Sequence, residues 1–375
     1  MFSEKAKKHA DACRFCYMCR HLCPVELVTG KENNTPRAKG LQVSMMERGM
    51  QMDKGCAVTM YECLLCGACT ADCVTGFDPL VFIREARTQA ALEELTPDFA
   101  QVVIDKLMDT GNPYGATECK VDLTGFPQQG ETLVWLGNAA RYAVPDVAAA
   151  LLSILRKAGV DCAVLADEPA SGCELGDMIG HVEDVRTQAK KAAAAIAATG
   201  AKKVVVLDSH DAAFFLHECK DWGIELPEVV TATSFVSELI KEGKLTPAKK
   251  DEVVSYHDAA RLSRDLAELE PAREIIAAMG AQLHEMYLNE KDNKNSAANR
   301  ACGSAVRAKE CGSSLMGQMK PELSVLLCRN RYVDLLRTDA RILVAADPQA
   351  TEALRREVPQ GCEYRDLFVM LDERL

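Results

Sequence analysis

The sequence predicts a helical amino-terminal domain followed by an α/β part made of two similar halves with parallel sheets. Two observations predict this. Two cysteine blocks with identical spacing lie within the first 73 residues. From residue 131 onward short apolar segments alternate with longer helical segments, and this order occurs twice. Strands that alternate with helices are typical of parallel sheets covered on both faces.

The cysteine blocks point to iron–sulfur chemistry. The first block contains Cys13, Cys16, Cys19 and Cys23, and the second contains Cys63, Cys66, Cys69 and Cys73. Each has the spacing C-x2-C-x2-C-x3-C that holds a 4Fe–4S cluster, and in two-cluster ferredoxins the fourth sulfur serves the other cluster. Every cysteine of the first block has a counterpart fifty positions later, which indicates an internal duplication.

We therefore expect two clusters with exchanged fourth ligands. The predicted ligands are Cys13, Cys16, Cys19 and Cys73 for one cluster, and Cys63, Cys66, Cys69 and Cys23 for the other. Pro24 directs Cys23 away from its own loop, whereas Val74 follows Cys73. Zinc is disfavoured because its sites usually use two C-x2-C pairs separated by a longer loop. Disulfides are disfavoured because no secretory signal is visible.

Residues 1–128 form the predicted two-cluster ferredoxin domain. Its turn Asn34-Thr35-Pro36-Arg37 precedes a helix over 38–50. Further helices are predicted over 78–95 and from residue 98 to about 108. The glycine- and proline-containing stretch 111–130 is a predicted linker.

The α/β part is predicted as two Rossmann-like halves, residues 129–250 and 251–375. In the first half we expect strands at 132–136, 161–165 and 203–207, with helices at 144–158 and 182–199. In the second half we expect strands at 252–256, 282–286 and 341–345, with helices at 272–279 and 325–338. The repeat aligns residues 206–210 with residues 344–348.

Composition excludes several classes of protein. A net charge of −11 argues against nucleic-acid binding, which requires a basic face. No apolar run approaches the length of a transmembrane helix. We expect a cytoplasmic protein, or one that reaches a membrane through a partner.

The tandem cysteine blocks, the Asn-Thr-Pro-Arg turn and the duplicated α/β module together resemble the iron–sulfur subunits of flavin-linked dehydrogenases. These include the iron–sulfur subunits of anaerobic glycerol-3-phosphate dehydrogenase and of glycolate oxidase, and the cysteine-rich subunits of heterodisulfide reductase. The resemblance implies a flavoprotein partner and two cysteine-rich CCG modules in the carboxyl-terminal part, which in that family can bind a further cluster.

Here the ligands of those modules are mostly missing. His257-Asp258-Ala259-Ala260 resembles a His-Asp-Pro-Cys turn, Ala301-Cys302-Gly303 resembles Cys-Cys-Gly, and Asp347-Pro348-Gln349-Ala350 resembles Cys-Pro-x-Cys. The first half keeps Cys173 and has Asp208-Ser209-His210-Asp211 where paired cysteines would be expected. A third cluster is not expected, because alanine supplies no ligand. His210, His257, Asp258 and Asp347 are interpreted as caps of turns and helices, with a replacement metal or proton-transfer site as the alternative.

The sequence thus favours an electron-transfer subunit that passes single electrons between a flavin-containing dehydrogenase and another carrier, with substrate turnover in another chain. The alternative is a disulfide or quinone reductase with its own site in the carboxyl-terminal module. That alternative needs Cys302, Cys311 and Cys328 to meet Cys173 in the fold.

Overall fold

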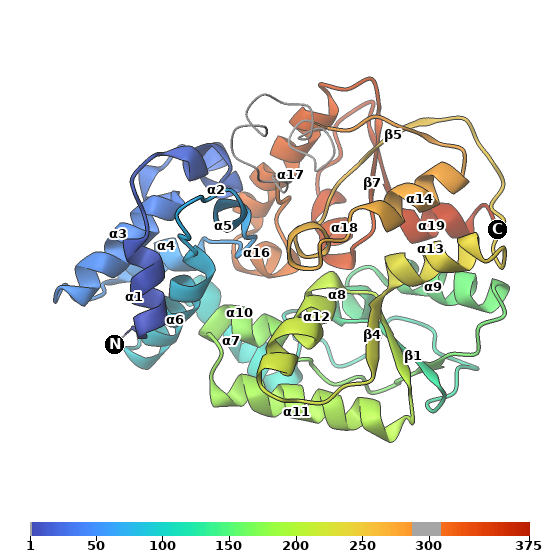
Figure 1. The fold of residues 1–375 in the computed structure, drawn as a ribbon, viewed down its shortest axis with the longest axis horizontal. Coiled ribbons are helices and arrows are strands. Elements are labelled where there is room, and N and C mark those ends of the chain that lie inside the picture. Colours follow the sequence, from blue (N-terminus) through green and yellow to red (C-terminus); the bar gives the residue numbers. More distant parts are fainter. Residues whose placement is uncertain (1, 287–308) are drawn as a thin grey trace.

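The computed structural model describes residues 2–286 and 309–375 (Figure 1). The helices of the amino-terminal part, coloured blue, form one end of the molecule. Two four-stranded parallel sheets with their helices form the rest. The two chain ends lie on opposite sides of the molecule (Figure 1).

The amino-terminal part is helical. It contains α1 (Glu4–Asp11), the short helix η1 (Met18–His21), α2 (Pro24–Thr29), η2 (Glu32–Asn34), α3 (Pro36–Glu47), α4 (Lys54–Tyr61), α5 (Ala68–Ala71), α6 (Pro79–Leu92) and α7 (Asp98–Thr110). Thr35 caps α3 by accepting a hydrogen bond from the Ala38 N–H, and proline occupies the first turn of α2, α3 and α6. The helices predicted from Pro36, over 78–95 and from residue 98 are confirmed.

The duplication extends beyond the cysteines. Helix α1 and helix α4 have equal length, lie fifty positions apart and each end two residues before the first cysteine of a block. Each begins at a side-chain cap, Ser3 for α1 and Asp53 for α4. The same local sequence signals thus start the helix that precedes each cysteine loop.

The first sheet has the strand order β2-β1-β3-β4. Its half contains β1 (Thr132–Trp135), α8 (Asn138–Tyr142), α9 (Pro145–Lys157), β2 (Ala163–Val164), α10 (Cys173–Ile179), α11 (Glu183–Ala198), β3 (Lys203–Val206), α12 (Ser209–Phe214), the π-helix η3 (Phe215–Cys219), β4 (Glu228–Thr231) and α13 (Ala232–Lys241). The strand predicted over 161–165 is shorter than expected, and β4 was not predicted.

The second sheet repeats this arrangement with the order β6-β5-β7-β8. Its half contains β5 (Val253–Tyr256), the π-helix η4 (Arg261–Asp265), α14 (Glu270–Ala278), β6 (Gln282–Leu283), α16 (Ser314–Met319), α17 (Pro321–Leu335), β7 (Ile342–Ala345), α18 (Pro348–Leu354), β8 (Glu363–Asp366) and α19 (Leu367–Asp372). All strand pairs in both sheets are parallel.

The strand pairing corrects the alignment of the repeat by one residue. Val206 pairs with Thr231, and Ala345 pairs with Asp366. Thr231 and Asp366 each cap the helix that follows, so Val206 and Ala345 are equivalent. Asp208 is therefore the counterpart of Asp347, and not of Ala346 as the repeat in the sequence suggests.

The two halves pack against each other through a shared core. Helix α9 of the first half lies along α19 of the second, and apolar residues of both sheets, such as Val134 and Val254, belong to one buried cluster. Ion pairs Lys157–Asp372, at 2.9 Å, and Arg355–Asp146, at 2.6 Å, join the same faces.

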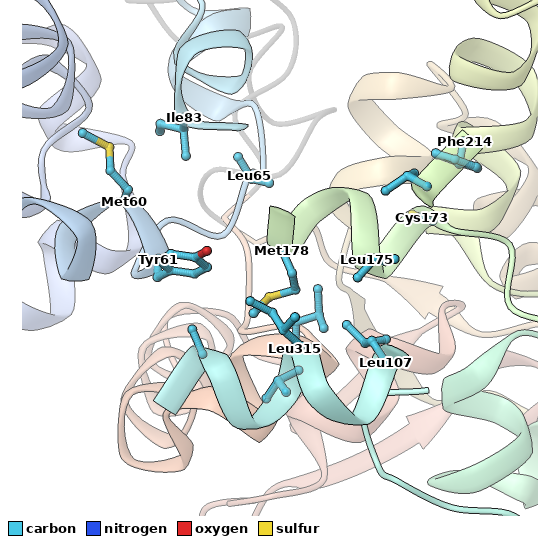
Figure 2. Packing of buried hydrophobic residues seen from close by; sticks show 14 of the residues in the cluster. Met60, Tyr61, Leu65, Ile83, Leu107, Cys173, Leu175, Met178, Phe214 and Leu315 are labelled. Atoms are coloured by element: carbon cyan, nitrogen blue, oxygen red, sulfur yellow. The ribbon is translucent and has the colours of Figure 1, made fainter. Parts of the chain in front are cut away.

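A second core joins the helical part to the α/β part (Figure 2). Tyr61 of α4 lies on the side of Met178 of α10, and Met60 of α4, Leu315 of α16 and Leu107 of α7 belong to the same buried cluster. Burial of such side chains stabilises a contact by roughly 25 cal/mol per Å² of apolar surface. The cysteine loops are therefore held on a packed base.

Within the described ranges, none of the helices combines the length and the apolar character that a membrane crossing requires.

Candidate functional site

The two cysteine loops have the same unusual backbone. Phe15 and Tyr17 have φ values of 54° and 66°, and their counterparts Leu65 and Gly67 have 50° and 72°. Positive φ is uncommon for bulky residues and is retained mainly where the surroundings enforce it, often at functional sites. Left-handed residues alternating with right-handed ones turn successive N–H groups into one concave nest that binds anions.

The N–H groups of both loops face sulfur. The Phe15 N–H donates to the Cys13 Sγ over 3.5 Å, and the Leu65 N–H donates to the Cys63 Sγ over 3.4 Å. A sulfide-rich, negatively charged group needs such donors. The loops therefore fit the cluster that their spacing predicts.

The second loop meets the fourth cysteine of the first. One cavity is lined by Cys63, Cys66, Cys69 and Cys23. Burial raises the pKa of Cys69 well above its usual value, and the thiols of Cys66, Cys63 and Cys23 raise it further, followed by Cys19. Pro24, at the start of α2, fixes the direction of the chain after Cys23.

The first loop lies with the fourth cysteine of the second. Burial raises the pKa of Cys19 to about 11, and the nearby thiols of Cys13, Cys16 and Cys73 raise it further. Since such electrostatic effects fall off with distance, these three thiols belong to the electrostatic surroundings of Cys19. One cavity thus groups Cys63, Cys66 and Cys69 with Cys23, and Cys19 has Cys13, Cys16, Cys73 and also Cys69 among its neighbours, so the division into two ligand sets stays a prediction.

Cations surround the more buried set. Lys39 is 2% exposed, donates from Nζ to the Asn34 carbonyl over 2.7 Å and opposes the burial that raises the pKa of Cys23. Arg264 of η4 donates from Nε to the Cys66 carbonyl over 2.5 Å, although burial still raises the pKa of Cys66 to about 12. Sequence reasoning missed both cations, because neither is near the cysteines in the chain.

The Asn-Thr-Pro-Arg turn also serves the first loop. The Thr35 side chain caps α3, and the Arg37 guanidinium lies 4.0 Å from the centre of the Tyr17 ring. This cation–π contact covers one of the two left-handed residues beside Cys16. The turn therefore orders the cysteine loop as well as starting the helix between the two blocks.

The degenerate module residues are mostly engaged in structural contacts. Asp347 accepts from the Ala350 N–H at the start of α18, as the capping interpretation predicts. At the start of α12 the cap is Asp208, which accepts from the N–H of His210, so His210 is not itself the cap. Asp258 pairs with Arg273 at 2.9 Å.

His257 differs from a cap. It accepts a hydrogen bond from the Arg331 Nε at 3.0 Å, and burial lowers its pKa well below the usual value. His257 is therefore a neutral side chain in the core and caps no turn.

A motif missed in the sequence is Glu310-Cys311-Gly312. Gly312, with φ of 93°, precedes α16 as Gly172, with φ of 97°, precedes α10. Glu310-Cys311-Gly312 therefore occupies the Cys-Cys-Gly place in the second half. The proposed Ala301-Cys302-Gly303 match lies outside the described residues. The signal for Glu310-Cys311-Gly312 in the sequence was its Cys-Gly pair just before a helix.

The cysteines outside the two blocks are free thiols throughout the described ranges. They are Cys56, Cys119, Cys162, Cys173, Cys219, Cys311, Cys328 and Cys362. Cys311 and Cys328 share a core cluster of the second half, whereas Cys173 belongs to the core under the helical part. The structure does not group Cys173 with Cys311 and Cys328.

Comparisons with known proteins agree with the loop geometry. A family model described as a 4Fe-4S dicluster domain matches residues 9–77. The chain is 27% identical to a probable membrane-anchored ferredoxin of Chromohalobacter salexigens, over 81% of this chain and 46% of that protein. It is 27% identical to one subunit of the dihydromethanophenazine:CoB–CoM heterodisulfide reductase of Methanosarcina barkeri, over 90% of this chain and 86% of that protein.

A third relative is the EtfAB:quinone oxidoreductase of Syntrophomonas wolfei, which is 26% identical over 67% of this chain and 38% of that protein. The chain thus spans less than half of the ferredoxin and of the quinone oxidoreductase, but most of the heterodisulfide reductase subunit. Taken with the paired loops, these matches identify residues 9–77 as a 4Fe–4S cluster-binding domain and the chain as an iron–sulfur protein related to that heterodisulfide reductase subunit.

Proposed function

We propose that this chain is an electron-transfer subunit that holds two 4Fe–4S clusters. The proposed ligands are Cys13, Cys16, Cys19 and Cys73 for the first, and Cys63, Cys66, Cys69 and Cys23 for the second. The observation that carries the proposal is the shared left-handed backbone of two loops that lie fifty residues apart. Positive φ is unfavourable for bulky residues such as Phe15, Tyr17 and Leu65. We therefore infer that binding of a ligand by the loops compensates for this backbone strain.

The chain's own groups set the surroundings of the clusters. When bound, each cluster supplies one-electron redox chemistry. The N–H groups of the loops donate toward the sulfur atoms, and Lys39 and Arg264 place positive charge beside the second set. Positive charge and burial are among the factors that determine cluster potentials. The second set is therefore expected to have the higher potential.

The rim of the first loop is a docking surface in this proposal. Cys16 is exposed, and its neighbours Phe15, Tyr17 and Met18 are 47%, 48% and 43% exposed. Exposed aromatic and methionine side chains around a redox centre suit a protein partner. We propose a flavin-containing dehydrogenase there, in keeping with the oxidoreductase names of two relatives.

We extend the proposal to the organisation of the chain. The ferredoxin domain covers residues 1–128, and two Rossmann-like halves cover 129–250 and 251–375. The repeated strand order supports this division. In this view the α/β part is a scaffold, the protein works in the cytoplasm or at a membrane through its partner, and a second carrier takes the electrons onward.

Double substitutions test the exchange of fourth ligands. Under the proposal, Cys16→Ser removes one cluster and leaves about four of about eight iron atoms per chain. Adding Cys73→Ser changes nothing further, since both residues serve the same cluster. Adding Cys23→Ser instead removes the remaining iron. Iron and acid-labile sulfide are measured on anaerobically purified protein, with EPR of the reduced sample.

The control is Cys56→Ser, which alters a buried cysteine three residues after the cap of α4 and outside both sets. It should keep all the iron. The reverse pattern, in which Cys16→Ser with Cys23→Ser retains four iron atoms, would show that each block holds its own cluster. Full iron content in Cys16→Ser would contradict the proposal altogether.

A further inference from the structure

A buried group of metal-ligating side chains lies between the two α/β halves. It consists of Asp208 and His210 after β3 and Asp347 after β7, with one ligand atom of each within 4.8 Å of the others. Asp208 and Asp347 are each 2% exposed. These residues follow equivalent strands of the two sheets, so the group sits where the carboxyl ends of both sheets meet.

The contacts across the group are reciprocal. The Ser209 N–H donates to Asp347 Oδ2 over 3.1 Å, and Gln349 Nε2 donates to both carboxylate oxygens of Asp208 over 3.2 Å. Each half thus supplies a carboxylate that is held by the other half. Held carboxylates are pre-organised ligands.

Two polar atoms at the group have no hydrogen-bond partner among the described residues. His210 Nδ1 is buried and lies 3.8 Å from Asp208 Oδ1. Gln349 is 2% exposed, and its Oε1 is unpartnered although its amide contacts Asp208. Buried polar atoms are nearly always paired. His210 Nδ1 and Gln349 Oε1 both carry lone pairs, so they indicate a partner that binds through those lone pairs, such as a cation.

The surroundings of the two carboxylates are mainly acidic, with Asp211 and Glu174 near Asp208, while Arg261 lies near His210. Two buried carboxylates held close together repel each other when both are charged. A cation would relieve this repulsion.

A second group of possible metal ligands in the described part of the second half differs in its charge balance. His257, Glu310 and Cys311 also lie close together, but Arg331 donates to His257 Nδ1, so His257 Nε2 carries the ring proton. That nitrogen is not free to bind a cation, and the arginine already supplies positive charge.

Entry from solvent is available. His210 lines a cavity of about 220 Å³, whose lining also includes the partly exposed His181 and Glu218 and the exposed His217. About seven water molecules, at ~30 Å³ each, would fill that volume. The cavity therefore brings solvent to His210, although its lining carries Arg84 and Arg261 as well as acidic side chains.

We propose that Asp208, His210 and Asp347 bind one divalent first-row cation that clamps the two α/β halves together. Two carboxylates and one imidazole suit Mn²⁺, Fe²⁺ or Zn²⁺, whereas a soft cluster would require thiolates.

Mn²⁺ is the probe, because thiols and clusters compete poorly for it. Loss of the free Mn²⁺ EPR signal is titrated with the anaerobically purified full chain, and thermal unfolding is followed with and without Mn²⁺. The expected result is one tight site per chain and a higher unfolding temperature. Asp347→Asn keeps the cap of α18, since asparagine also caps helices, yet weakens binding about tenfold or more.

Asp366→Asn is the matched control, because Asp366 caps α19 after the neighbouring strand β8 and lies outside the group. It should bind Mn²⁺ like the unaltered chain. His210→Gln, a change at the partly exposed edge of the group, should also weaken binding and guards against misfolding of the aspartate variant. Equal binding by all four proteins would reveal adventitious surface binding, and would overturn the proposal, as would the absence of a tight site.

Discussion

Arg87 is the buried cation on which the attachment of the second cysteine loop depends. It is 2% exposed on α6. Its Nη2 donates to the Cys63 carbonyl over 2.6 Å and to the Met60 carbonyl over 2.9 Å, while its Nη1 donates to the Asp177 carbonyl over 2.6 Å. One side chain therefore ties the end of α4, just before the loop, to α10 of the first α/β half.

We predict that Arg87→Met lowers the free energy of unfolding by about 3–5 kcal/mol. Each hydrogen bond from a charged donor contributes about 1.5–3 kcal/mol, and four carbonyls lose their donor, the longest contact being that to Tyr61 at 3.4 Å. The loss of these hydrogen bonds is partly offset, because methionine does not carry the cost of burying a charge. The expected loss of stability is therefore about 3–5 kcal/mol, as for breaking a buried charged network. Urea unfolding under anaerobic conditions, followed by circular dichroism, measures the change.

Arg84→Met is the control. Arg84 lies one turn earlier on α6 and pairs with the Asp177 side chain at 3.0 Å, in a more exposed position. It should cost about 1 kcal/mol, the upper range of a partly exposed pair. If Arg87→Met stayed within 1 kcal/mol of the unaltered chain at an unchanged denaturant slope, the carbonyl contacts would not carry the stability assigned to them.

Three further predictions concern other parts of the chain. Burial raises the pKa of Glu174 to about 8, so the folded state holds a proton that the unfolded state loses, and stability should fall as pH rises from about 5 to 8, with a slope of up to about 1.4 kcal/mol per pH unit. Glu174→Gln should flatten that slope in urea unfolding at several pH values. Gly180→Ala should cost more than 2 kcal/mol because a Cβ there would meet Thr88 Oγ1 at 2.1 Å, whereas Gly200→Ala, also at positive φ but in open space, should cost about 1 kcal/mol in the same assay. Cys56→Ala should leave the EPR spectrum unchanged and lower the unfolding temperature slightly, and a lost cluster signal would show that this thiol is a ligand.

The parts of the fold that follow from local signals could be predicted from the sequence. Proline and cap residues placed the helix at Pro36, and runs of valine placed β3. Strands β4 and β8 were missed because they are sheet edges of four residues that carry charges, as in Glu363-Tyr364-Arg365-Asp366. The apolar content of β8 is too low for a strand pattern, whereas the valines of β4, Glu228-Val229-Val230-Thr231, were a usable signal.

The candidate site divides in the same way. The spacing of the cysteines is local information, and it predicted the 4Fe–4S cluster-binding domain over residues 9–77. Arg87, Lys39 and Arg264 reach the loops through tertiary packing, and in the sequence they look like ordinary surface cations. Buried charges can be recognised only when the fold shows what surrounds them.

The core shared by α4, α10 and α16 has a consequence for catalysis (Figure 2). The cysteine loops cannot swing like a tethered shuttle between two docking positions, because moving them would expose that packed surface. The length of the route for an electron through this chain is therefore constant. The rate of electron transfer would then depend on the binding and release of other proteins at the exposed rim around Cys16. The cysteine loops themselves would stay in one position.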